Sequence, residues 1–203
     1  MVFQRILLVI YFISYNRQMK KLNKLALLFF LILFTSSGNN LAETMLKDNF
    51  NDPDRWEYIS DNVMGGISTG QVEYQNFDGE LVAKLSGNVT TENNGGFIQI
   101  RMNLSKINLD KAKSIKLIAK GNKQKYFIHL RTTGTFLPWQ YYQSEFIVDE
   151  KCKEFIFPIE SFKKSGSLMA KRVNPKKITS IGLVAYGRNH QAELLIKEVQ
   201  FIN

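Results

Sequence analysis

The sequence predicts one all-β domain, a sandwich or barrel of short strands, preceded by an export signal. From about residue 44 onward, short runs of apolar or alternating residues are bounded by Gly, Asn, Asp or Pro, which is typical of such folds. Helical spacing is weak everywhere except at residues 159–164, and there is no internal repeat or interior linker. A domain of about 160 residues buries roughly two thirds of its unfolded surface, so this one needs neither metal nor disulfide for stability.

The first 42 residues have the layout of a secretory leader. A basic stretch begins at Met19, the unbroken apolar run of residues 25–34 follows, and small and polar residues lead to Ala42. That run suits a signal-peptide helix, because a membrane-spanning helix needs roughly 20 apolar residues. We therefore predict a leader at residues 1–42 with its true start at Met19, cleavage after Ala42, and a mature domain at residues 43–203.

Residues 1–18 do not fit that plan, because a second apolar stretch at residues 6–13 precedes the basic cluster. The alternatives are a cleavage site near Ser36 or Ser37 and an uncleaved two-part membrane anchor. The sequence thus predicts an exported protein, periplasmic or secreted, or a membrane-anchored one if the leader stays in place.

The predicted strands follow in chain order, and each has a boundary signal on either side. They cover residues 71–74, 80–86, 97–102, 114–119, 126–131, 141–148, 154–157, 178–186 and 193–201. Cys152 is the only cysteine and is predicted to lie at the edge of a strand, so no intramolecular disulfide can form.

The formal charge of +9 overstates how basic the domain is. The leader contributes Arg5, Arg17, Lys20, Lys21 and Lys24 with no acidic residue, which leaves a mildly basic remainder. Nucleic acid is not expected as a partner of an exported protein. An acidic glycan or peripheral association with an anionic membrane stays open.

One segment, Gly66-Ile67-Ser68-Thr69-Gly70, matches the G-x-S-x-G pattern of serine hydrolases. A nucleophile elbow needs a helix after the serine, whereas residues 71–74 alternate like a strand. His129 and His190 are the only candidate bases, and with one cysteine they form no metal-ligand spacing. We expect a protein that is not an enzyme and that has no metal site and no cofactor.

Two glycine-rich segments resemble the signatures of a known family. They are Ser60-Asp61-Asn62-Val63-Met64-Gly65-Gly66-Ile67-Ser68, after Trp56, and Glu92-Asn93-Asn94-Gly95-Gly96-Phe97-Ile98-Gln99-Ile100-Arg101. Both are similar to motifs of the NADH:ubiquinone oxidoreductase complex I intermediate-associated protein 30 family, and the later segments follow that family's order. The resemblance covers nearly all of residues 45–203.

This resemblance implies a galactose-binding-like jelly roll, the sandwich used by many carbohydrate-binding modules. Mitochondrial members of the family act as assembly factors for respiratory complex I. Here a secretory-type leader stands where a transit peptide would be. We therefore expect a binding module and not a literal complex I assembly role.

The family motif residues, Asp61, Gly65, Gly66, Asn94, Gly95, Gly96 and Arg101, have two interpretations. In the first, the glycines form two tight corners packed together, with Asp61 or Glu92 paired to Arg101. In the second, the two segments form a rim that binds a ligand or partner.

The hairpin-like stretch at residues 126–148 gives a sharper candidate for a binding site. If its aliphatic faces meet in the core, strand alternation places a mixed aromatic and polar set on the opposite side. That set is His129, Arg131, Trp139, Tyr141, Gln143 and Glu145. Such a mixture suits a sugar or a protein hot spot, while a merely solvated sheet face is the alternative.

Two functions therefore follow from the sequence. The first is a protein-interaction or assembly factor of the cell envelope. The alternative is a carbohydrate-binding module, whose partner would be a glycan.

Overall fold

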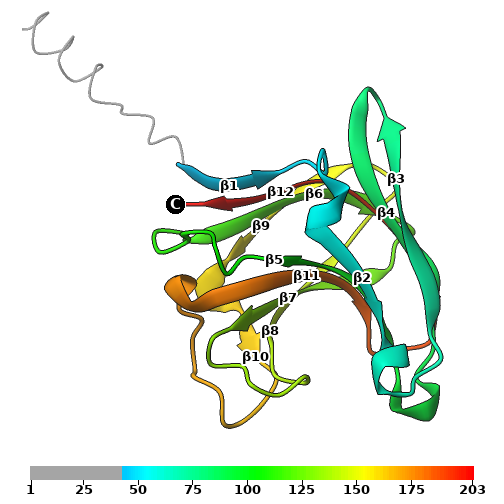
Figure 1. The fold of residues 1–203 in the computed structure, drawn as a ribbon. Helices are drawn as coiled ribbons and strands as arrows, with labels where there is room; N and C mark the ends of the chain where they lie inside the picture. The colour runs from blue at the N-terminus through cyan, green and yellow to red at the C-terminus, as the bar shows by residue number, and fades with distance from the viewer. Residues whose placement is uncertain (1–42) are drawn as a thin grey trace, which may run out of the picture. The chain divides into compact units, whose positions relative to one another are not determined.

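The computed structural model describes residues 43–203, which form two antiparallel sheets of six strands each (Figure 1). The predicted leader, its signal helix and its cleavage site lie outside the described residues. In sheet A the order is β3 (Thr69–Phe77), β4 (Glu80–Val89), β12 (His190–Ile202), β6 (Ser114–Gly121) and β9 (Lys153–Pro158), and β1 (Thr44–Asp48) also pairs with β12. In sheet B the order is β10 (Lys163–Lys164), β8 (Tyr142–Ile147), β7 (Lys125–Thr132), β11 (Ile178–Tyr186), β5 (Phe97–Asn103) and β2 (Trp56–Ser60).

Short 3-10 turns connect several of these strands. They are η1 (Pro53–Arg55), η2 (Asp61–Met64), η3 (Glu92–Asn94), η4 (Ile159–Ser161) and η5 (Pro175–Lys177). The helical spacing noted at residues 159–164 is only the single turn η4 followed by β10, so that expectation was wrong. Within the described residues no helix is long and apolar enough to cross a membrane.

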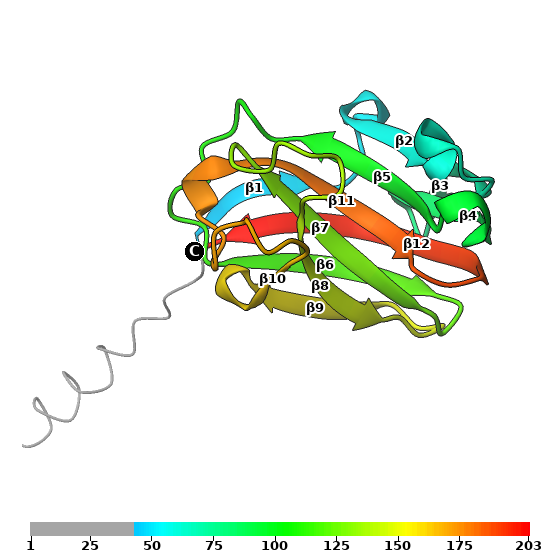
Figure 2. The same ribbon diagram turned by 90° about the horizontal axis from the view of Figure 1, so that it is seen from below.

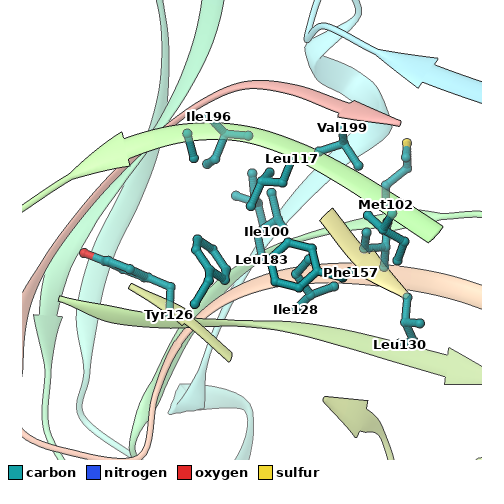
Figure 3. Packing of buried hydrophobic residues seen from close by; sticks show 14 of the residues in the cluster. Ile100, Met102, Leu117, Tyr126, Ile128, Leu130, Phe157, Leu183, Ile196 and Val199 are labelled. Carbon is teal, nitrogen blue, oxygen red and sulfur yellow. The ribbon is translucent and has the colours of Figure 1, made fainter. Parts of the chain in front are cut away.

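The core lies between the two sheets and is built by strand alternation. On β7 the side chains of Tyr126, Ile128 and Leu130 are fully buried, and Leu117 and Val199 of sheet A are buried as well (Figure 3). Each fully buried aliphatic side chain contributes about 1.5–3 kcal/mol. The predicted inward face of the 126–148 hairpin is therefore confirmed.

The described segment has a hydrophobic core of its own. Among the described residues, the buried members of the core lie between Phe50 and Phe201, and both sheets contribute to one continuous cluster. Residues 43–203 thus hold two complete layers around their own core, so this segment can fold on its own.

Candidate functional site

The two glycine-rich segments meet around the buried side chain of Asp61. Its carboxylate accepts hydrogen bonds from the amide and hydroxyl of Ser68, at 2.9 and 2.5 Å, and from the amides of Gly96 and Phe97, at 2.5 and 3.1 Å. No part of the Asp61 side chain is exposed. Burial raises the pKa of Asp61, but the hydrogen bonds from Gly96, Ser68 and Phe97 outweigh burial and hold it below its usual value.

Glycine is required on both sides of this carboxylate. A Cβ at Gly66 would lie 2.4 Å from the Asp61 carboxyl carbon, and a Cβ at Gly95 would lie 2.5 Å from its Oδ2. Gly65 ends η2 with φ of 91°, a left-handed conformation that favours glycine. The two segments are therefore two corners packed together, as the first interpretation predicted.

The ion pair predicted for this motif is wrong. Arg101 donates to Glu57 at 2.9 Å across the β2–β5 pair, and Asp61 pairs with backbone amides instead. Alternation along β5 places Arg101 on the outer side of sheet B, whereas Asp61 follows the end of β2 and points into the corner. Asn94 of the motif lies in η3 with φ of 59° and has an exposed side chain.

Ser68 belongs to the same corner. The strand expected after it is present, since β3 begins at Thr69. The Ser68 hydroxyl is buried, donates to Asp61 and accepts from the Thr90 amide at 3.0 Å. Its environment gives this hydroxyl a structural role.

The outer side of sheet B gathers aromatic, amide and basic side chains from four neighbouring strands. Strand pairing places Arg101 of β5, Gly182 of β11, His129 of β7 and Gln143 of β8 in one row across the sheet. We call this surface the sheet B outer face and define it by Gln99, Arg101, Phe127, His129, Tyr141, Gln143 and Tyr186. Figure 2 looks at the molecule from below, toward the strands that carry it.

Four rings on this face contact one another. Tyr141 stacks on His129, with ring centroids 3.9 Å apart and an angle of 12° between the planes. Tyr186 approaches Phe127 edge-on at 5.7 Å and His129 at 5.6 Å. The rings therefore form one packed platform.

Two buried polar atoms of this face have no hydrogen-bond partner among the described residues. They are Nε2 of His129 and Oε1 of Gln143, which stand opposite each other on β7 and β8, and both are shielded from solvent. An unpaired buried polar atom costs about 1–3 kcal/mol. Because neither atom is exposed, a bound group would reach them, and remove that cost, only after the stacked Tyr141 ring shifts.

The enclosure of His129 yields a prediction about its charge. Burial lowers the pKa of His129 to about 3, and the neighbouring Gln143 side chain acts in the opposite direction. In the unfolded chain, His129 takes up a proton near pH 6.5. In the folded domain, His129 stays neutral until the pH falls to about 3. The stability that neutral His129 contributes is thus complete above pH 6.5 and is lost as the pH falls below it.

An NMR titration of the His129 ring measures this directly. We expect no protonation between pH 7 and pH 5. A ring that titrates near pH 6.5 in the folded domain would show that His129 is open to water.

The other predicted site residues are placed less centrally. Arg131 lies on the same side of β7, but its guanidinium donates to the carbonyls of Thr135, Leu137 and Pro138 and so holds the β7–β8 loop. Glu145 faces outward and pairs with Lys125 at 3.1 Å. Trp139 lies in the loop before β8, and among the described residues its ring makes no close aromatic contact.

Sheet A presents a different outer surface. Its outward-facing positions carry ion pairs such as Lys84 with Glu193 and Lys116 with Glu154, and Lys120 lies 3.6 Å above the Phe77 ring. A hollow of about 420 Å³ beside Phe77 is lined mainly by charged and amide residues. This is the pattern of a solvated face.

Metal binding has no support in the described part of the chain, where no three His, Cys, Asp or Glu residues come together. At the end of the sheet B outer face, a hollow of about 460 Å³ is bordered by Glu57, Arg101 and Arg131. Its chemistry suits hydroxyl or anionic groups.

Sequence reasoning missed part of this face. Phe127 lies two positions before His129, so strand alternation already places both on one side. Gln99 and Tyr186 could not be found in this way, because they join the site only through the pairing of β5 and β11 with each other and with β7.

Comparison with known proteins gives a family and a fold. A profile of the family described as complex I intermediate-associated protein 30 matches residues 46–196. No curated protein sequence matches the chain.

Solved structures with a similar fold include carbohydrate-binding modules. The family 11 module from Clostridium thermocellum, in complex with a β-1,3-1,4-mixed-linked tetrasaccharide, has a TM-score of 0.65 at 16% identity, covering 81% of this chain and 98% of that chain. The family 11 module of cellulosomal cellulase Lic26A-Cel5E from the same organism has a TM-score of 0.63 at 15% identity, covering 80% and 95%.

A larger protein, an exo-β-agarase, is similar over 79% of this chain but only 25% of its own, with a TM-score of 0.53 at 10% identity. At these identities the similarity shows the fold alone.

Proposed function

Because this chain belongs to the complex I intermediate-associated protein 30 family and has the fold of carbohydrate-binding modules, we propose that it is a non-catalytic binding module for a glycan. The ligand lies against the sheet B outer face. One observation carries this proposal: an aromatic platform stands beside unpaired polar atoms on the outer side of a sheet.

The chemistry of a sugar fits this combination. The C–H faces of a pyranose ring pack on aromatic side chains such as Tyr141 and Tyr186, while its hydroxyls both donate and accept hydrogen bonds. Nε2 of His129 and Oε1 of Gln143 become such partners once the stacked Tyr141 ring shifts, and the Arg101 guanidinium lies in the same row of the sheet. A face that served only solubility would resemble the outer surface of sheet A, with its lysine–glutamate ion pairs.

Replacing Tyr141 by Ala tests the site. Glycan affinity should fall by about 2 kcal/mol, the scale of an aromatic hot spot, because the stacked ring and the shielding of His129 are both lost. The measurement is isothermal titration with an oligosaccharide that the wild-type domain selects from a glycan array.

Phe77→Ala is the matched control, since Phe77 is an aromatic residue on the outer side of sheet A. It should leave affinity unchanged. Equal losses in both variants, or an array on which the wild-type domain binds nothing, would refute the proposed site.

The family favours a second candidate, a protein-interaction or assembly factor of the cell envelope. The family's description names association with complex I intermediates, and its profile spans most of the domain. If this candidate is correct, neither the wild-type domain nor the Tyr141→Ala variant binds any glycan on an array. The wild-type domain instead captures a protein partner from the native envelope.

A further inference from the structure

Two loops at the end of sheet B present bare apolar side chains. Phe136 is 83% exposed and Trp139 is 61% exposed in the β7–β8 loop, and Leu168 is 93% exposed in the segment after β10. Leu137 is also exposed. We call Phe136, Leu137, Trp139 and Leu168 the apolar tip, and Figure 1 shows both loops projecting beyond sheet B on its outer side.

Hydrogen bonds hold the first of these loops in shape. The Arg131 guanidinium donates to three of its carbonyls, as described above. Oε1 of Gln140 accepts from the amides of Phe136 and Leu137, at 2.8 and 3.1 Å. The exposed side chains are therefore displayed by an ordered loop.

Ser165 joins the two loops. Its hydroxyl donates to the Trp139 carbonyl at 2.8 Å and accepts from the Tyr141 amide at 3.0 Å. Nζ of Lys164 donates to the carbonyls of Ser167 and Met169 on either side of Leu168. The loop that carries Trp139 and the loop that carries Leu168 are therefore held together by hydrogen bonds.

The surroundings of the apolar tip are basic. Residues 111–144 and 161–192 contain no Asp or Glu. Lys163, Lys171, Arg172 and Lys177 are exposed in the segments that flank the tip, and the Lys177 carbonyl accepts from the Thr133 amide at the base of the first loop. The exposed apolar side chains thus lie in two stretches that carry exposed basic residues and no carboxylates.

A second group of exposed apolar residues provides a contrast. Val63, which is 75% exposed, and Met64 lie in η2 beside the glycine corner, where Glu92 of η3 brings an acidic side chain. This group has apolar exposure without basic residues in η2 or η3.

We propose that the apolar tip inserts into the interfacial region of an anionic lipid membrane. Trp and Phe favour the membrane–water interface, and each nearby Lys or Arg is attracted by anionic headgroups. A tip of a few side chains reaches the headgroup region only, which makes the association peripheral and reversible. The apolar tip shares no residue with the sheet B outer face, and the two are tested by different variants and ligands, so either proposal can fail without the other.

Vesicle co-sedimentation of residues 43–203 tests this proposal. The vesicles contain phosphatidylcholine with about one third phosphatidylglycerol, and vesicles of pure phosphatidylcholine serve as the neutral comparison. The wild-type domain should bind the anionic vesicles, and the double variant Phe136→Ser/Trp139→Ser should lose about tenfold or more in affinity. Val63→Ser is the control and should bind like the wild type.

Tryptophan fluorescence locates the contact. The chain has two tryptophans, and Trp56 is buried, so a change on adding vesicles reports Trp139. Its emission should shift to shorter wavelength and become protected from acrylamide with anionic vesicles. Three results would each overturn the proposal: no binding to vesicles, equal binding by the double variant, or a tip that is needed only to capture a protein.

Discussion

Replacing Asp61 by Asn should lower the free energy of unfolding by about 3 kcal/mol or more, although the two side chains have nearly the same shape. The carboxylate accepts four hydrogen bonds in a fully buried corner. An amide turns one acceptor into a donor that faces the amides of Gly96 and Phe97, and buried donors without a partner cost about 1–3 kcal/mol each. Urea denaturation of both proteins measures the difference.

The same carboxylate should make the free energy of unfolding depend on pH in the acid range. Because its pKa is lower in the folded domain than in the unfolded chain, its contribution is complete above about pH 4 and is lost as the pH falls below that value. The Asn variant should lack this part of the acid dependence. Asp54→Asn, at an exposed position of η1, is the control and should change stability by less than about 0.5 kcal/mol. An Asp61→Asn variant as stable as this control would show that the corner does not depend on the carboxylate.

Truncating Trp56 to Ala should cost about 3–5 kcal/mol of unfolding free energy. The indole is buried at the start of β2 and packs on Phe50 at 5.2 Å between ring centroids. Its Nε1 donates to Oδ1 of Asp48, which also accepts from the Phe50 amide, and Arg55 pairs with the other oxygen. The change therefore opens a cavity and removes one donor from a buried carboxylate.

The Phe variant separates the two effects. Trp56→Phe keeps most of the packing and loses the hydrogen bond, so thermal or urea unfolding should show a clearly smaller loss. If the Ala variant lost less than about 1 kcal/mol, Trp56 would not be part of the core.

The strands with alternation or long apolar runs could be predicted from the sequence, because their side-chain period records which face is buried. The strand predicted at residues 126–131, for example, is β7 with one residue added at each end. The strands that were not predicted have no such side-chain period. β10 consists of two exposed lysines and exists only because it pairs with β8, while β1 and β2 are short and carry mixed burial.

The candidate site was predicted only as far as one hairpin reaches. Alternation brought His129, Tyr141 and Gln143 together, but the sequence does not reveal which strand lies next to β7, so Tyr186 was absent. The sequence also does not reveal which backbone carbonyls accept hydrogen bonds from a side chain. Arg131 was expected to face a ligand, and it holds the carbonyls of its own loop.

NMR mapping of backbone amide shifts shows where on the domain a glycan binds, which we propose is the sheet B outer face. The domain of residues 43–203 is titrated with an oligosaccharide selected on the array, beginning with the mixed-linked β-1,3-1,4 tetrasaccharide seen in the similar module. We expect the largest shift changes on β5, β11, β7 and β8, around Gln99, His129 and Tyr186. Changes that gather on the outer side of sheet A around Phe77 and Lys120, with sheet B unaffected, would contradict it.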